Sequence, residues 1–220
     1  MKVLIKETNK LKSSSSELNR RREKWKSVTQ PQIEVKFKKI SENAKKLEYP
    51  FSLFYHVNDK TINEVTVQLS SGANVTGVVE KIDQPDIKGA ICEGEKGSAL
   101  VASFSSAGVV NFIISPYKSE RYARKEKDIL LHSGLNPDDV SDKLIEKCIA
   151  NYLLYSRNSS VYGKYSNTRL DRFKINKMLL VDVRNRKELY QTLWGWFIEV
   201  LKITAGGIVG YVVAILTQTP

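Results

Sequence analysis

Residues 98–114, "SALVASFSSAGVVNFII", form the stretch of this sequence that decides its fold. Two β-rich runs, "SALVASF" and "GVVNFII", are separated by "SSAG", which is typical of a hairpin connection. The pattern predicts two neighbouring antiparallel strands joined as a hairpin.

The β-rich pattern extends upstream from this hairpin. "FSLFYHV", "EVTVQLS" and "VTGVVEKI" follow one another between residues 51 and 82, and "NDKT" at 58–61 supplies turn residues between the first two. We expect about five short strands between residues 51 and 115, in a small antiparallel sheet or barrel that Pro116 closes.

Helical patterns lie on both sides of this region. Residues 31–48 predict an amphipathic helix, with lysines opposite an apolar stripe. The stripe consists of Ile33, Phe37, Ile40, Ala44 and Leu47. Residues 1–30 are polar and basic, and they predict a solvated or partly disordered arm, with a short charged helix from Glu17 as the alternative.

Two more helices are expected after the sheet. Residues 119–135 predict one, and residues 136–157 predict another, with Asn136 as its N-cap and Pro137 at its first position. The buried face of the second helix is expected to hold Val140, Leu144, Ile145, Cys148, Ile149 and Tyr152. The expected fold class is therefore α+β: a soluble domain over residues 49–157, a small antiparallel β-sheet or barrel flanked by helices, followed by a C-terminal hydrophobic helix.

The net charge of +11 is carried by the two flanks of this domain. Residues 1–50 hold 14 Lys/Arg and 6 Asp/Glu, residues 51–163 hold 12 and 14, and residues 164–192 hold 8 and 3. A nucleic-acid-binding domain more often carries its charge on the folded body. The distribution weakens that class of function without removing it.

The sequence offers no convincing catalytic, metal or cofactor site. Its two histidines and two cysteines lack the spacing of a zinc site, and a pairing of Cys92 with His132 is less favoured than a structural thiol. "GEKGS" at residues 94–98 lacks the residue order of a phosphate-binding loop. We therefore expect a non-enzymatic protein, with an enzyme acting at a membrane surface as a third choice.

Residues 193–217, "LWGWFIEVLKITAGGIVGYVVAILT", predict a membrane anchor. The 15 uncharged residues after Lys202 span only roughly 22 Å as a helix. Lys202 can extend its ammonium group to the headgroups, and Tyr190, Trp194 and Trp196 lie where an aromatic belt holds a helix entry. The segment thus predicts a single-pass anchor with a cytoplasmic N-terminus.

The segment before this anchor is basic. Residues 158–192 form a basic linker, in which Arg184, Arg186 and Lys187 are expected to contact an anionic membrane surface. Two alternatives stay open for the apolar tail: the buried final strands of a soluble domain, and a terminus that inserts only when it is released.

Small residues recur every four positions in the tail, at Gly206, Gly210 and Ala214. Such a stripe lets membrane helices approach closely, so it predicts a homo-oligomer. The expected function is that of a tail-anchored protein with a sensor or interaction domain, in one version a membrane-disrupting effector of antiviral defence or a toxin. The alternative is a soluble nucleic-acid-binding or adaptor protein whose C-terminus is buried in the core. The protein partner or small ligand of the soluble domain stays open.

Overall fold

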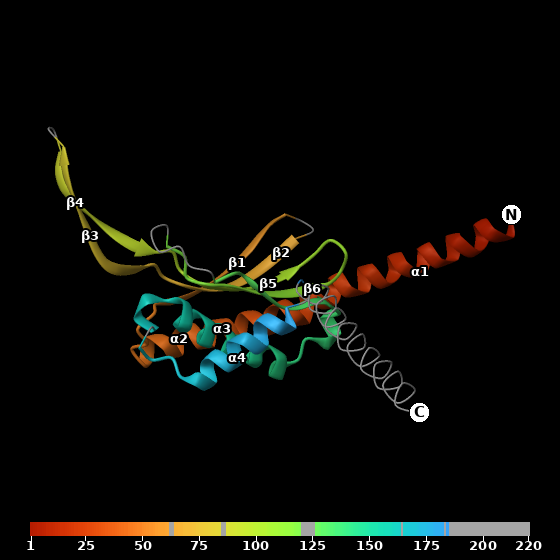
Figure 1. The fold of residues 1–220 in the computed structure, drawn as a ribbon. Coiled ribbons are helices and arrows are strands. Elements are labelled where there is room, and N and C mark those ends of the chain that lie inside the picture. The colour runs from red at the N-terminus through yellow and green to blue at the C-terminus, as the bar shows by residue number, and fades with distance from the viewer. Residues whose placement is uncertain (62–63, 85–86, 120–125, 164, 183, 185–220) are drawn as a thin grey trace, which may run out of the picture.

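A computed structural model describes residues 1–61, 64–84, 87–119, 126–163, 165–182 and 184. These residues form an α+β structure, in which a five-stranded antiparallel sheet carries three helices on one face (Figure 1). The expected α+β class is confirmed, and the sheet is open rather than closed into a barrel. The helix expected at 193–217 lies outside the described residues.

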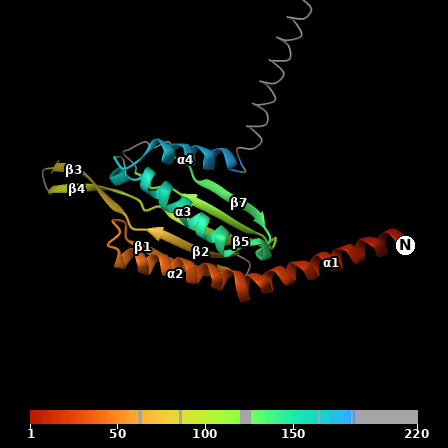
Figure 2. The ribbon, with the colours of Figure 1, turned by 90° about the horizontal axis from the view of Figure 1, so that it is seen from below.

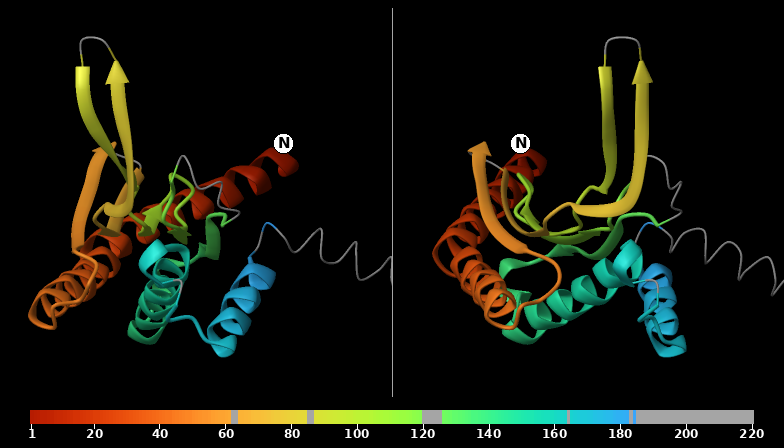
Figure 3. Two further views of the ribbon diagram at one scale, coloured as in Figure 1. Left: turned by 60° about the vertical axis from the view of Figure 1, so that its left-hand side comes forward. Right: turned by 90° about the vertical axis from the view of Figure 1, so that its left-hand side faces the viewer.

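The strands fall into two groups. Their bounds are β1 Leu53–Thr61, β2 Glu64–Ser71, β3 Asn74–Gln84, β4 Ile87–Glu95, β5 Ala99–Phe104, β6 Val110–Ser115 and β7 Ile129–Leu135. The main sheet has the order β1-β2-β5-β6-β7, and β3 pairs only with β4 in a long hairpin. This hairpin rises from the side of the sheet opposite the helices (Figures 1 and 3).

Five of the strands coincide with the β-rich runs of the sequence, whereas β4 and β7 were not expected. The "NDKT" residues belong to β1, which continues to Thr61, so the expected turn at 58–61 is wrong. Residues 129–135, expected as part of a helix, form β7 and pair with β6. A short apolar run fits either state, and β7 is a strand because the edge of β6 offers it backbone partners.

The expected β5–β6 hairpin is confirmed, and β5 is the central strand of the sheet. Its turn is closed by hydrogen bonds from Ser105 N to Val109 O (3.0 Å) and from Gly108 N to Ser105 O (2.9 Å). Gly108 has a φ of 75°, a conformation that suits glycine.

The core lies between the sheet and the helices. One row of paired residues crosses four strands, and all four of its side chains are fully buried. The row consists of Leu69, Leu100, Ile114 and Ile129. Alternate residues, such as Gln68 and Ser103, lie on the opposite face and are only half-buried, which is the alternation expected of a sheet covered on one side.

The N-terminal region is a long helix that is exposed to solvent, as one form of the expectation had it, but it is not partly disordered, and it begins at Lys2 rather than near Glu17. α1 (Lys2–Lys24) continues through a π-helical turn (Trp25–Thr29) into α2 (Gln30–Lys46). α1 buries none of its residues and projects beyond the sheet (Figures 1 and 2). Glu17 pairs with Arg20 and Arg21 one turn later, which supports a helix that is otherwise exposed over most of its length.

The π-helical turn keeps one face of this long helix on the core. Trp25, Thr29, Ile33 and Phe37 recur every four residues and are all buried. An α-helix drifts by about 40° over such a step, and the wider turn corrects that drift. Trp25 stacks on Phe104 at 5.1 Å between ring centroids.

Two further helices complete the layer below the sheet (Figure 2). They are α3 (Asp142–Ser159), which lies between α2 and α4, and α4 (Arg169–Val181). Asn136 and Pro137 begin a separate 3-10 turn (Pro137–Asp139) rather than α3, whose N-cap is Ser141. The expected face of α3 is confirmed, since Ile145, Cys148, Ile149 and Tyr152 are buried together with Val140, and Leu144 is half-buried.

A buried polar joint connects the base of the β3–β4 hairpin to α3. The Ser98 hydroxyl lies 2.9 Å from that of Ser71 and 2.5 Å from that of Ser156. The buried Glu95 carboxylate accepts hydrogen bonds from the Ser160 hydroxyl (2.9 Å) and from the backbone N–H of Val161 (3.0 Å). Moving the hairpin away from the helices would leave these buried polar groups without hydrogen-bond partners, which costs free energy. The joint therefore fixes the hairpin relative to the helices.

Candidate functional site

The structure describes only one of the site residues expected from the sequence, Arg184. The others lie outside the described residues: Arg186, Lys187, Tyr190, Trp194, Trp196, Lys202, Gly206, Gly210 and Ala214. Their roles in anionic contact, interface anchoring and helix packing stay predictions.

Arg184 fastens the end of α4 to β7. Its backbone N–H and its guanidinium donate to the Asp182 carboxylate, and Nη2 also donates to the carbonyl of Asp128. Asp182 is buried and accepts from the backbone N–H of Leu130 at 2.9 Å. Burial alone would raise the pKa of Asp182, but the hydrogen bonds from Arg184 and Leu130 hold it below its usual range.

Half of the Arg184 side chain, 55%, remains exposed. An anionic surface can therefore reach the guanidinium only from the side that Asp182 leaves open. Arg184 therefore has a structural role in holding α4 next to β7, and no sequence pattern indicated that role.

The start of α4 is equally well fixed. Thr168 and Asp171 form a reciprocal capping box, with the Asp171 N–H donating to Thr168 Oγ1 and the Thr168 N–H donating to the Asp171 carboxylate. Arg157 of α3 donates to the same carboxylate at 2.8 Å. α4 is thus held at both ends, and its inner face packs on the core through Ile175 and Met178.

The outer face of α4 is apolar although it faces solvent. Leu170 is 72% exposed, Phe173 68%, Leu180 54% and Val181 45%. At 100° per residue these four side chains lie within about 100° of one another on the side of the helix away from Ile175, and Lys177 falls between them. Exposed apolar side chains gathered in this way are typical of a surface that has a partner.

Cations lie among and beside these apolar side chains. Arg169, Arg172, Lys174 and Lys177 are all exposed. Within the part of the chain that the structure describes, none of these four forms an ion pair. We call the four apolar and four basic residues of α4 the α4 surface; its composition suits contact with an apolar layer bounded by negative charge.

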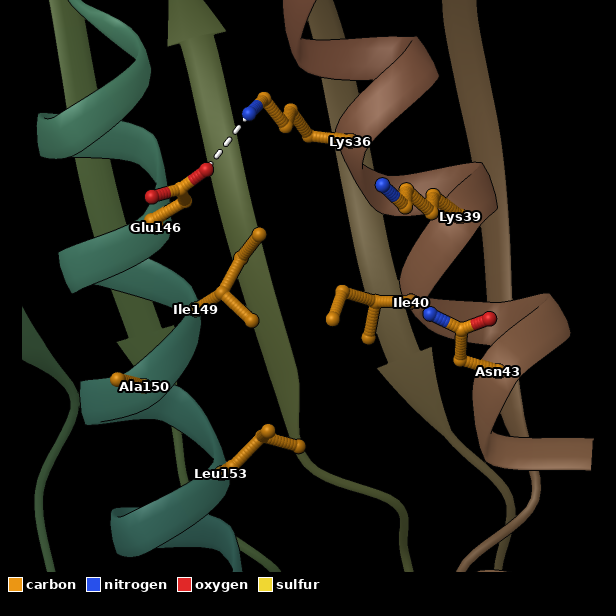
Figure 4. A pocket seen from close by; sticks show the side chains of 8 residues that line it. All are labelled: Lys36, Lys39, Ile40, Asn43, Glu146, Ile149, Ala150 and Leu153. Atoms are coloured by element: carbon orange, nitrogen blue, oxygen red, sulfur yellow. Dashed lines mark hydrogen bonds and ion pairs between the residues drawn. The ribbon is translucent and has the colours of Figure 1, made fainter. Parts of the chain in front are cut away.

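A second candidate site is the groove between α2 and α3, of about 380 Å³ (Figure 4). Ile149 and Leu153 of α3 point across it toward Ile40 of α2. One end is closed by Lys36, whose Nζ lies 2.6 Å from Glu146 Oε1 and 3.3 Å from Asp142 Oδ2. These carboxylates raise the pKa of Lys36, the largest cause being the hydrogen bond that Lys36 donates to Glu146.

This groove has the chemistry of a binding surface rather than of a catalytic site. Its eight lining residues include no histidine, cysteine or hydroxyl side chain, and its one carboxylate is paired with Lys36. Nothing on its walls identifies an occupant.

Candidate nucleophiles and metal ligands are scattered. Cys92 is exposed on β4, whereas His132 lies on β7 in the other sheet, so the pair considered from the sequence is divided between two sheets. Burial raises the pKa of Cys148 to about 12, which makes it an inert thiol at neutral pH. In the described residues no three His, Cys, Asp or Glu side chains gather to hold a metal ion.

The α4 surface was missed because α4 has two apolar faces. Its sequence, "RLDRFKINKMLLV", mixes both with basic residues, and periodicity alone does not say which face is buried. The spacing of Leu170, Phe173 and Leu180 was the available signal.

Among the helices of the described residues, none combines the length and apolar character that a bilayer crossing requires. The sequence matches no protein-family model, and comparison with curated proteins and with solved structures finds no match for it.

Proposed function

We propose that this is a non-enzymatic, membrane-attached protein whose α4 surface lies on an anionic bilayer, next to an apolar tail that anchors it. The observation that carries the proposal is the exposed apolar and basic outer face of α4. The soluble domain over residues 49–157 then serves as the sensor or interaction domain on the cytoplasmic side.

The α4 surface has the energetics of a peripheral contact. Full burial of a large apolar side chain is worth about 1.5–3 kcal/mol, and a cation near an anionic leaflet adds about 1 kcal/mol. Four side chains of each kind support reversible association, while stable attachment needs a second element. We assign that second role to residues 193–217.

The length of chain between the two elements fits this arrangement. Eleven residues lie between Val181 and Leu193, and the twelve Cα-to-Cα steps reach at most about 43 Å when fully extended. The apolar segment therefore starts within reach of a bilayer on which α4 lies.

The tail is the basis for the proposed oligomerisation. The stripe of Gly206, Gly210 and Ala214 is the basis for expecting a homo-oligomer, and a clustered, membrane-damaging effector of antiviral defence or a toxin is one version of it. That version rests on architecture alone.

The soluble nucleic-acid-binding or adaptor alternative draws on the basic N-terminal flank. Part of that charge is already neutralised within the protein, because Arg20 and Lys24 pair with Asp138 and Arg21 pairs with Glu17. The free cations of α4 are the stronger candidates for an external anionic partner.

A fluorescent probe on α4 tests the proposal. In full-length protein with Cys92→Ser, a polarity-sensitive dye is attached at Phe173→Cys, and the buried Cys148 stays unlabelled. With anionic nanodiscs we expect a blue shift of the dye emission, because the side chain at 173 enters the interface. Position Val35→Cys on α2 is the control, since it is 64% exposed and α3 separates α2 from α4. Equal shifts at the two positions, or none at 173, contradict the proposal.

A further inference from the structure

A small pocket lies between β7, α3 and α4 and has a volume of about 190 Å³. We call it the basic pocket; its walls are Leu131, His132, Lys147, Asn151, Lys174, Lys177, Met178 and Val181. It is smaller than the ~300–1,000 Å³ of pockets for drug-sized ligands, so it suits a compact group.

The charge of the basic pocket is positive throughout. Lys147 from α3 and Lys174 and Lys177 from α4 line it, and no carboxylate does. Among the residues that the structure describes, these three lysines have no ion-pair partner. Three ammonium groups around one cavity repel one another, and an anion placed between them removes that cost.

The neutral polar groups of the pocket complete an anion site. Burial, and secondly the charge of Lys147, lowers the pKa of His132, so its imidazole is neutral at pH 7 and offers one N–H donor. The His132 ring is held edge-on to Phe112, with 6.4 Å between centroids. The Asn151 amide supplies further donors.

The pocket shares three residues with the α4 surface. Lys174, Lys177 and the half-exposed Val181 belong to both, and Leu131 and Met178 give the pocket an apolar side. A ligand with a phosphate group and an apolar extension therefore finds cations in the pocket and an apolar surface beside it.

We infer that the basic pocket binds a phosphate monoester, and that on the bilayer of the proposed function, on which this inference rests, the monoester is a lipid headgroup. A monoester carries a charge of about −1.5 to −2 at pH 7, which three lysines match better than the single charge of a phosphodiester. The protein then selects phosphatidate-type lipids rather than negative charge in general.

His132 and His56 are the only histidines, which makes the site observable by NMR. β7 and β1 are opposite edges of the sheet, so His56, exposed on β1, is an internal reference. In full-length protein with labelled histidine, phosphatidate nanodiscs are expected to shift the His132 signal and leave that of His56 in place. Phosphatidylglycerol nanodiscs of equal net charge should leave both signals unchanged.

Lys147→Gln supplies the matched variant, with Lys143→Gln as its control. Both lysines are exposed on α3, one turn apart, and only Lys147 lines the pocket. We expect Lys147→Gln to weaken phosphatidate binding about tenfold or more, as the loss of one charge-assisted contact implies, and Lys143→Gln to weaken it less than twofold.

Comparison with glycerol 3-phosphate in solution distinguishes a lipid headgroup from a free phosphate ester as the ligand. Tighter binding of phosphatidate nanodiscs supports the headgroup, whereas equal affinity for the soluble ester overturns it in favour of a free phosphate ester. If neither ligand moves His132 at saturating concentration, the pocket is not a phosphate site. That result leaves the dye test of the α4 surface untouched, so the inference and the proposed function fail separately.

Discussion

Gly97 shows how a single residue fixes the joint between the β3–β4 hairpin and the main sheet. It lies between the buried Glu95 and Ser98, and a Cβ at this position would collide with the backbone carbonyl of Ser71. Gly97, the second glycine of "GEKGS", is thus required by the close approach of two backbone segments, not by a phosphate.

Gly97→Ala is expected to destabilise the protein by about 1–3 kcal/mol, a fall in Tm of about 2–12 °C for a chain of this size. The reason is that the backbone of Ser71 cannot move without breaking the Ser71–Ser98 hydrogen bonds. Thermal unfolding followed by circular dichroism measures the change.

Gly72→Ala is the control for this prediction. A Cβ at Gly72 meets only ordinary contacts, the nearest being Phe54 Cε2 at 3.5 Å. Equal melting temperatures for the two variants would show that the Gly97 contact is not restrictive.

At the scale of elements, helices and strands were predicted correctly where the sequence pattern had only one interpretation. The β5–β6 hairpin, the buried face of α3 and most of the α2 stripe follow from local periodicity and turn chemistry, and the structure has them. The exception is Leu47, which follows the end of α2 and is 80% exposed. The run 129–135 was misassigned because the pairing of β7 with β6 is a long-range contact that no local pattern records.

The same limit applies to the candidate site. α4 is flanked by a capping box and a buried aspartate, which a local pattern can suggest, but its solvent-facing side depends on where α3 and β7 lie. The basic pocket draws residues from three elements, so no sequence window contains it.

The tail is the element for which helical spacing makes the sharpest prediction. If tail helices pack through Gly206, Gly210 and Ala214, Gly210→Ile places a branched side chain at the centre of the contact and blocks it. The variant is expected to need detergent for extraction, as the wild-type protein should, yet to lose oligomers in cross-linking. Apolar character is retained, so insertion is not weakened.

Val209→Ile, which falls on another side of the same helix, is expected to keep the oligomers. In a β-hairpin the four-residue period has no such meaning, because neighbours on one face recur every two residues. Similar behaviour of the two variants, or release of Gly210→Ile protein from membranes, would count against the helix pairing.

At the scale of the whole molecule, the helices divide the protein into sides of different character. α2 and α4 lie on either side of α3 below the sheet, while the β3–β4 hairpin rises above it (Figures 2 and 3). A bilayer in contact with α4 leaves the hairpin and the open face of the sheet available to a protein partner or ligand.

This arrangement predicts whether the protein without its tail binds an anionic membrane or a nucleic acid more tightly. A chain ending at Arg186 retains α4 and its unpaired cations, so it should bind anionic vesicles weakly, with an affinity that falls steeply as salt rises. Nucleic acid would give a similar salt dependence, and direct competition between vesicles and duplex or single strands separates the two. We expect the protein to bind the vesicles more tightly than the nucleic acid.

A double substitution distinguishes membrane binding, which uses apolar side chains, from nucleic-acid binding, which uses phosphate contacts. Leu170→Ser with Phe173→Ser removes exposed apolar area from the α4 surface and leaves every cation in place. It should weaken vesicle binding at least about tenfold, because an interfacial helix depends on its apolar side chains, and it should not change binding that uses phosphate contacts alone. Leu11→Ser with Val35→Ser, on α1 and α2, removes similar exposed groups and should change neither. A clear preference for nucleic acid, unaffected by the α4 pair, would replace the membrane by the nucleic-acid alternative.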